Sequence, residues 1–166
     1  MSEAEERMAF SSARIAEVKA TIRQQKQIDF PSKNRLCVYV TGSYGRYEAT
    51  QFSDLDLFFV GRGNEAKEKD KITNVDHSLI NASVIKSCRG LNFPEFSGGG
   101  EYLTIHYISD MLDDLGGSDD DYKNYFTARM LLLLESKCVH NSRVYDKCIN
   151  LIIERYFVDY HDHETT

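Results

Sequence analysis

The sequence predicts an α/β chain of the α+β kind, with a small mixed β-sheet backed by helices and further helices toward the C-terminal end. Two short apolar segments flank a glycine-bearing turn, and a third segment alternates apolar and polar residues with the period of a strand. Elsewhere, apolar residues recur at every third or fourth position, which is the period of a helix. Strands are expected at 36–40, 54–60 and 101–108, and the longer helices at 4–27, 71–88, 122–138 and 142–160.

The N-terminal half is expected to supply the centre of the sheet. Helical spacing of Ile15, Val18 and Ile22 favours a first helix. Residues 36–40 are β-branched or aromatic in the manner of a strand. The stretch from Leu57 to Val60 is wholly apolar, which is typical of a strand buried on both faces.

The C-terminal half is expected to add one strand and several helices. Leu103, Ile105 and Tyr107 alternate along the third strand. A short helix at 110–115 should end at the following glycines, and the acidic run at 118–121 is explained by helix capping. The two longer helices then carry apolar runs suited to burial.

Composition limits the classes of function. The 166 residues fit one domain, 1–166, and the final helix lacks a stop signal, which favours a piece of a longer polypeptide. The net charge of −6 argues against strong non-specific binding of a long nucleic acid. No apolar run approaches the length of a membrane span. The acidic N-terminus is unlike a signal peptide, and the four cysteines lack paired spacing. A cytoplasmic protein with reduced thiols is expected.

The acid pair Asp54 and Asp56 is the most informative feature of the chain. Residues two apart in a strand point to the same face, so both carboxylates should project together. Hard cations such as Mg²⁺ take oxygen ligands and are often held by one or two carboxylates plus substrate phosphates. The pair therefore predicts a site for one or two Mg²⁺ ions.

The turn before the acid pair supplies candidates for phosphate binding. Gly42 would let the backbone approach a phosphate without a Cβ in the way, and Ser43 offers a hydroxyl and an N–H group. Arg46 would either contact a phosphate or form a salt bridge with Glu48. Ser53 is expected to shape the turn that enters the second strand.

Two stretches carry a family resemblance: Gly-Ser-Tyr-Gly-Arg-Tyr-Glu at 42–48 and Ser-Asp-Leu-Asp-Leu at 53–57. Together they resemble the signature of the nucleotidyltransferase superfamily, which includes DNA polymerase beta. The form is most similar to the nucleotidyltransferase domain of the bifunctional protein-PII uridylyltransferases and related predicted bacterial transferases. Residues 126–136 more weakly resemble the helix that follows the catalytic sheet in those proteins.

The resemblance implies transfer of a nucleoside monophosphate from a nucleoside triphosphate, such as ATP or UTP, to a protein or small-molecule acceptor, with release of pyrophosphate. It also implies a third carboxylate on a neighbouring strand, for which Glu101 is the candidate and Glu95 the alternative. His77 and His106 are given no role. A chain that lacked the third acid would instead be a nucleotide-binding regulatory module, and a chain whose acids are only structural would be an interaction domain.

Overall fold

A computed structural model describes residues 2–26, 35–63, 72–96, 100 and 103–164 of the chain. Its centre is a four-stranded sheet with strand order β3-β2-β1-β4. The antiparallel pairs are β1 with β2 and β1 with β4, whereas β2 and β3 run parallel. The predicted mixed sheet backed by helices is therefore confirmed. The strands are β1 (Leu36–Val40), β2 (Leu57–Gly61), β3 (Ile105–Tyr107) and β4 (Lys137–His140).

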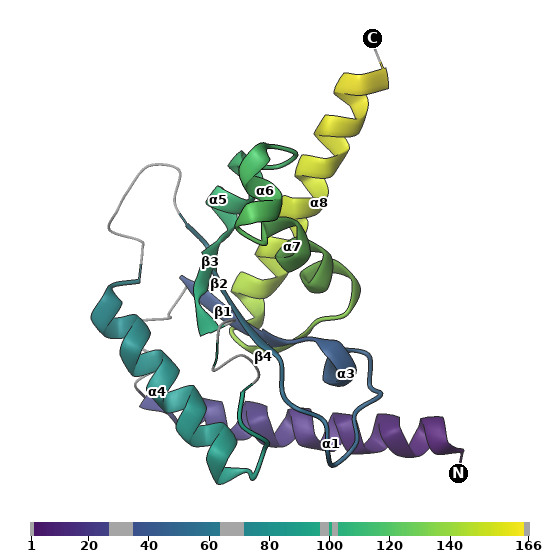
Figure 1. Cartoon of the computed structure of the whole chain (residues 1–166), viewed down its shortest axis with the longest axis vertical. Coiled ribbons are helices and arrows are strands. Elements are labelled where there is room, and N and C mark those ends of the chain that lie inside the picture. Colours follow the sequence, from purple (N-terminus) through teal and green to yellow (C-terminus); the bar gives the residue numbers. More distant parts are fainter. Residues whose placement is uncertain (1, 27–34, 64–71, 97–99, 101–102, 165–166) are drawn as a thin grey trace.

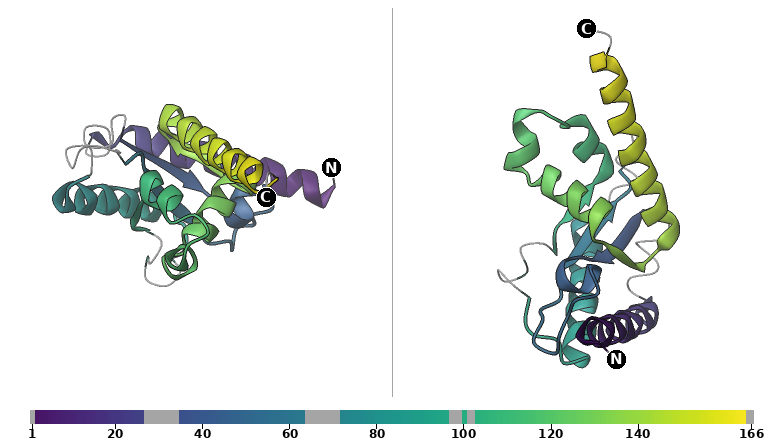
Figure 2. Two further views of the ribbon diagram at one scale, coloured as in Figure 1. Left: turned by 90° about the horizontal axis from the view of Figure 1, so that it is seen from above. Right: turned by 90° about the vertical axis from the view of Figure 1, so that its right-hand side faces the viewer.

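Helices cover both faces of this sheet, as Figure 1 and the right-hand view of Figure 2 show. On one side lie α1 (Glu3–Arg23) and α4 (Asn74–Gly90). On the other side lie α5 (Ile108–Asp113), α7 (Tyr125–Leu134) and α8 (Ser142–Glu164). Two short helices, α3 (Gly42–Gly45) and α6 (Ser118–Tyr122), complete the described elements.

The alternation of side chains along β1 and β2 divides the core in two. Val38 and Phe59 pack with the side chains of α1 and α4, whereas Tyr39 and Phe58 pack with those of α5, α7 and α8. Both strands are buried along their whole length, as expected for a sheet covered on both faces. The two-residue period of the strands thus decides which of their side chains belong to each core.

The first helix follows from local signals in the sequence. Ser2 accepts a hydrogen bond from the Glu5 N–H, and the Glu5 carboxylate accepts one from the Ser2 N–H, which forms a capping box. Ile15, Val18 and Ile22 are buried against the sheet. The helix ends at Arg23, earlier than the predicted position 27, which lies outside the described residues.

Three predicted elements need correction. The second strand begins at Leu57 and not at Asp54, so the acid pair precedes the strand. The third strand is described only from Ile105 to Tyr107. The helix expected to reach Cys138 ends at Leu134, and the residues after it form the edge strand β4.

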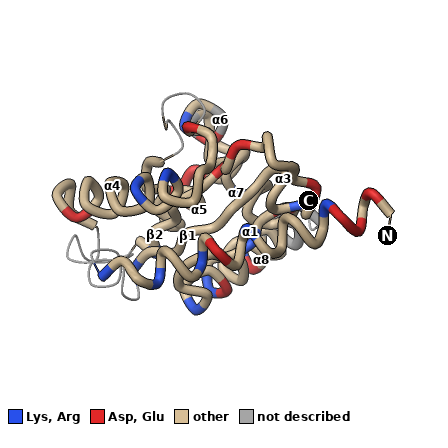
Figure 3. Tube along the Cα trace, turned by 90° about the horizontal axis from the view of Figure 1, so that it is seen from below, with Lys and Arg blue, Asp and Glu red and all other residues tan. Residues whose placement is uncertain are grey.

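Charged side chains of both signs are mixed along the helices (Figure 3), and the cysteines form no disulfide with one another. Figure 3 shows Lys and Arg interspersed with Asp and Glu along the helices, with the first turn of α1 acidic. All four cysteines are free thiols, and Cys37, Cys88 and Cys148 are buried. Among the described residues, no helix is both long enough and apolar enough to cross a membrane.

Candidate functional site

The acid pair lies where the pairing of β1 with β2 ends. Beyond the last strand pair, the Thr41 N–H donates to the Asp56 carbonyl oxygen at 3.0 Å, which extends the ladder by one residue. Leu55 is 3% exposed and belongs to the core under α1 and α4, together with Leu57. Because side chains alternate along extended backbone, Asp54 and Asp56 are directed away from that core.

Gly42 lies directly against the second carboxylate. Its φ is +61°, in the left-handed region that favours glycine. A Cβ at this position would lie 2.6 Å from Asp56 Oδ2, so the Asp56 carboxylate would have to shift. The backbone conformation therefore favours glycine here, and the missing side chain lets the acid lie directly against the turn.

The electrostatics of Asp56 reflect a crowded, partly buried site. Burial raises the pKa of its carboxyl group, and the negative charges of Asp54 and Glu135 raise it further, while the positive charge of Arg46 opposes them. Carboxylates that repel one another in this way are stabilised when a cation binds between or beside them. The hard oxygen donors of the pair therefore fit a divalent cation such as Mg²⁺.

The turn after β1 is a compact helical turn that closely contacts the end of α7. The Ser43 carbonyl accepts from the Glu48 N–H at 2.7 Å, so the turn closes on itself. A Cβ on Gly45 would lie 1.7 Å from the Glu135 carbonyl oxygen. The second glycine of the motif is thus required for packing against the backbone that follows α7.

Arg46 is held by two carboxylates in this structure. Its Nε donates to Glu48 Oε2 at 2.8 Å, and its Nη1 forms an ion pair with Glu135. The Arg46 side chain is 45% exposed, so water weakens both interactions. The salt bridge with Glu48 that the sequence offered as one alternative is present. Glu135, which the sequence did not indicate, joins it from the end of α7.

Ser53 forms part of the turn that leads to the acids. Its hydroxyl accepts from the Thr50 N–H at 3.0 Å, and its own N–H donates to the Thr50 carbonyl at 3.1 Å. These bonds close the turn at 50–53 and set the direction in which the chain reaches Asp54.

The third carboxylate expected from the resemblance is not located. Glu101 lies outside the described residues. Glu95 accepts two hydrogen bonds from Arg89, both at 3.0 Å, and both side chains are exposed. Glu135 is the further acid whose charge reaches Asp56. Within the described part of the chain, no three His, Cys, Asp or Glu side chains are grouped closely enough to hold a metal ion.

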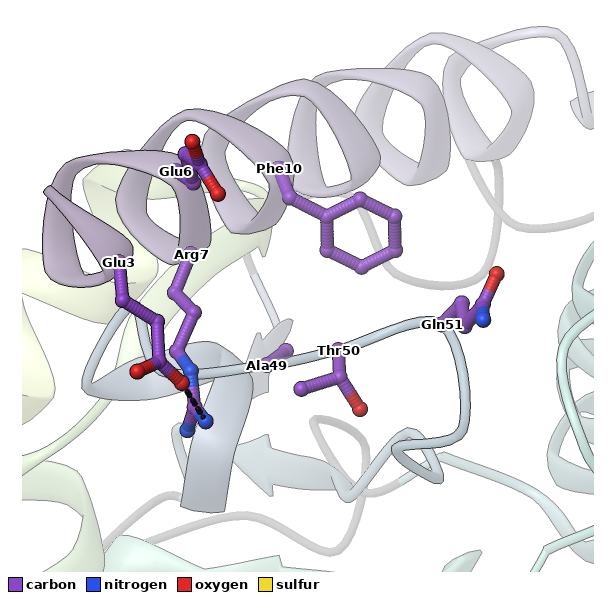
Figure 4. A pocket seen from close by; sticks show the side chains of 7 residues that line it. All are labelled: Glu3, Glu6, Arg7, Phe10, Ala49, Thr50 and Gln51. Carbon is purple, nitrogen blue, oxygen red and sulfur yellow. Dashed lines mark hydrogen bonds and ion pairs between the residues drawn. The ribbon is translucent and has the colours of Figure 1, made fainter. Parts of the chain in front are cut away.

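A separate hollow of about 340 Å³ lies between the start of α1 and the segment 49–51, and Figure 4 shows its lining. Its charged residues include Glu3 and Arg7, which pair with each other at 2.5 Å. Phe10 and Thr50 form part of its wall, and neither Asp54 nor Asp56 lines it. This hollow therefore does not extend the acid site.

Comparison with known proteins gives a match for one segment of the chain. The chain has no match among curated proteins or among solved structures. Residues 22–89, from the last two residues of α1 almost to the end of α4, match the family model of the nucleotidyltransferase domain. This segment contains the glycine turn and both acids, and the match supports its placement in the nucleotidyltransferase superfamily.

Proposed function

We propose that the chain is a Mg²⁺-dependent nucleotidyltransferase that moves a nucleoside monophosphate from a nucleoside triphosphate to a protein or small-molecule acceptor. The observation that carries the proposal is the approach of Asp56 to Gly42, at the end of a ladder that turns Asp54 and Asp56 away from the core. In the reaction, an acceptor oxygen bonds to the α-phosphorus. The bond from that phosphorus to the bridging oxygen breaks, pyrophosphate leaves, and the acceptor's proton passes to water.

The acids and the turn have complementary tasks in this proposal. Asp54 and Asp56 would hold one or two Mg²⁺ ions, which supply charge neutralisation for the triphosphate and the leaving pyrophosphate. Gly42 lets the chain approach the phosphates, and the Ser43 hydroxyl and N–H donate to them. The Ser53 turn fixes the direction of Asp54. The protein thus acts by positioning and by electrostatics.

Arg46 would change partners when the substrate binds. Its guanidinium pairs with Glu48 and Glu135 beside Asp56, and its exposed position leaves those ion pairs weak. A triphosphate bound at the turn presents a more concentrated negative charge, so Arg46 would exchange one carboxylate for a phosphate oxygen. The sequence resemblance favours an activity of the protein-PII uridylyltransferase type, and Glu101 remains the proposed third acid.

Transfer can be tested with purified protein, Mg²⁺ and each of four labelled nucleoside triphosphates, with a lysate as the source of acceptors. Label should move to an acceptor with release of pyrophosphate. Asp54→Asn and Asp56→Asn should each lower the rate by at least about 100-fold. Asp113→Asn, which changes an exposed acid on α5, is the matched control. Absence of transfer and of pyrophosphate with every triphosphate would contradict the proposal.

A second candidate is a nucleotide-binding regulatory module that does not transfer. The observation that favours it is that the described residues contain no group of three possible metal ligands. Calorimetry separates the two functions. Tight Mg²⁺-dependent binding of a triphosphate without turnover would support the module, whereas turnover that is lost in Glu101→Gln would support the enzyme with its third acid.

A further inference from the structure

A cavity of about 420 Å³ opens on the same side of the sheet as the acid pair. Its floor includes Phe58 of β2, which lies two residues after Asp56 and therefore on the same face, about 7 Å further along the strand. Thr104 and His106 line it from β3 and the residue before it, and Tyr125 and Thr127 line it from the first turn of α7. The volume is within the range of small-molecule sites.

The cavity joins the matched segment to the rest of the chain. Phe58 belongs to residues 22–89, which match the nucleotidyltransferase domain, whereas the lining residues at 104–127 lie outside that match. The two parts meet through the parallel pairing of β2 with β3, in which Val60 lies opposite His106. Most of the lining residues therefore belong to the part of the chain outside the matched segment.

The walls provide aromatic rings and one cation, because the Lys123 ammonium lies 5.6 Å from the centre of the Tyr125 ring. Phe58 and His106 stack with their ring centroids 6.1 Å apart and their planes 28° apart, and His106 meets the Tyr125 ring edge-on at 6.2 Å. Burial lowers the pKa of His106, so its imidazole stays neutral at pH 7. Aromatic walls are typical of sites that bind nucleobases, because every base has a π-face to stack against them.

Polar side chains that line the cavity could form hydrogen bonds with the edge of a base. Asn124 holds a left-handed conformation with φ 57° at the start of α7, yet its side chain makes no capping hydrogen bond to that helix. Its amide is exposed on the cavity wall, where it offers two donors and an acceptor. Thr104 and Thr127 also line the cavity, and their hydroxyls offer further partners.

We propose that this cavity holds the nucleoside part, the base with its ribose, of the triphosphate whose phosphates bind at the acid pair and the Gly42–Ser43 turn. The proposal rests on the nucleotidyltransferase function proposed above. One nucleotide would then reach from the acid pair into this cavity, with its phosphates beside Asp56 and its base against the rings of His106 and Tyr125, which are both partly exposed. Asn124 and Thr104 would then discriminate among bases.

Asn124→Gly tests this assignment with little effect on folding, since glycine adopts φ 57° readily while the amide is lost. Asn92→Gly is the matched control, because Asn92 is exposed, has φ 56° and lies after α4 outside the cavity lining. The affinity of the full chain for each of four nucleoside triphosphates with Mg²⁺ is measured by calorimetry. Inorganic tripolyphosphate with Mg²⁺ serves as a probe of the phosphate end alone.

Asn124→Gly should weaken the binding of the preferred nucleoside triphosphate by about 5- to 10-fold, which is the effect of one hydrogen bond. The differences in affinity among the four nucleoside triphosphates should also become smaller. Tripolyphosphate affinity should not change, and neither should any affinity in Asn92→Gly. The NMR signal of the His106 ring should shift when a nucleoside triphosphate is added and stay in place when tripolyphosphate is added.

Three outcomes would overturn the assignment. If Asn124→Gly and Thr104→Val leave all nucleotide affinities and their order unchanged and the His106 signal stays in place, the base lies elsewhere while the proposed function stands. If these variants alter only the transfer rate, the cavity serves the acceptor. If the unaltered chain binds neither tripolyphosphate nor any nucleotide, the proposed function fails together with this assignment.

Discussion

At the scale of single residues, the two glycines of the turn have different structural roles. Gly42 combines a positive φ with close approach to the Asp56 carboxylate. Gly45 has an ordinary φ, and what excludes a side chain there is the Glu135 backbone carbonyl. The first glycine therefore belongs to the candidate site, and the second belongs to the packing of α3 against the chain after α7.

Alanine substitutions should separate these roles. Gly42→Ala should lower the free energy of unfolding by about 1–2 kcal/mol, the strain of a left-handed alanine, and should abolish Mg²⁺-dependent nucleotide binding. Gly45→Ala should destabilise the fold by about 3 kcal/mol, since a backbone carbonyl cannot easily move aside. Urea titration measures both. Gly90→Ala has open space around its Cβ and should stay within about 1 kcal/mol of the unaltered chain.

Asp56 should reduce the stability of the folded chain while no cation is bound. Its pKa is raised by burial and by Asp54 and Glu135, so the folded carboxyl group holds its proton more tightly than the unfolded one. The stability of the fold then falls as pH rises from the unfolded value, about 4, through the raised folded pKa. At pH values above the folded pKa of Asp56, the variant Asp56→Asn should therefore not show this loss of stability.

At pH 7, Asp56→Asn should raise the free energy of unfolding by up to about 1 kcal/mol, since water screens a half-buried carboxylate. This corresponds to a rise in Tm of about 2–4 °C, measured by differential scanning calorimetry. Mg²⁺ with a triphosphate should raise the Tm of the unaltered chain and not that of the variant. A variant that is less stable at pH 7, or that still responds to the ligand, would contradict the role given to Asp56.

At the scale of elements, β4 shows how pairing overrides local periodicity. The residues that follow the apolar run of α7 are compatible with a helix, and the sequence therefore predicts that the helix reaches Cys138. Instead, Ser136 donates its hydroxyl to the Leu132 carbonyl, and the chain extends to pair Cys138 with Tyr39. The Asn141 side chain then donates to the Leu36 carbonyl at 2.9 Å.

The buried pair Arg129–Asp120 joins α7 to α6. Arg129 is 1% exposed, and its Nη1 donates to Asp120 Oδ1 at 2.7 Å and to the Met111 carbonyl at 2.6 Å, while its Nε donates to Tyr156. The sequence explains the acidic run at 118–121 by helix capping, whereas in the structure Asp120 forms this ion pair. Neither side chain could be assigned its partner from spacing along the sequence, because nine residues and a turn separate them.

Removing one member of this pair should be strongly destabilising. Arg129→Met leaves Asp120 buried without its cation, and we expect a loss of about 3–5 kcal/mol in urea titration at pH 7. The exposed Arg143→Met is the control. The hydrogen bond from Arg129 lowers the pKa of Asp120, so the pair's contribution is present above the unfolded value, about 4, and is lost as pH falls through the folded one.

The double variant Arg129→Met with Asp120→Leu should recover part of the lost free energy of unfolding. Replacing both members of a buried ion pair by apolar groups leaves no unpaired charge, whereas replacing one member does. Equal urea midpoints for Arg129→Met and Arg143→Met at pH 7 would show that the ion pair does not anchor α6 to α7.

At the scale of the whole molecule, one sheet separates two cores. Ile22 of α1 is fully buried in the core between the sheet and the helices α1 and α4. Ile152 of α8 is fully buried in the core between the sheet and the helices α5, α7 and α8. Both cores include side chains of β1 and β2, so loss of the sheet would release both. We propose on this basis that residues 1–166 fold as a single domain.

Cooperative unfolding tests that expectation. Ile22→Ala and Ile152→Ala should each lower the free energy of unfolding by about 2–5 kcal/mol and leave one transition. Far-ultraviolet circular dichroism and tyrosine fluorescence should give coincident curves in urea for both variants. A second transition, or curves that separate in only one variant, would show that the two layers unfold independently.

The sequence by itself determined the first helix, β1, the turn at Gly42 and the mixed α/β class, because these depend on local periodicity, capping and the conformational freedom of glycine. It also indicated the acid pair, since two carboxylates next to a buried strand stand out without knowledge of any partner. Tertiary structure alone decided that Glu135 approaches Asp56, that Arg129 pairs with Asp120 and that Phe58, His106 and Tyr125 line one cavity. The physical reason is that the partners in each contact lie on different elements of the chain, so no local period along the sequence shows which of them will meet.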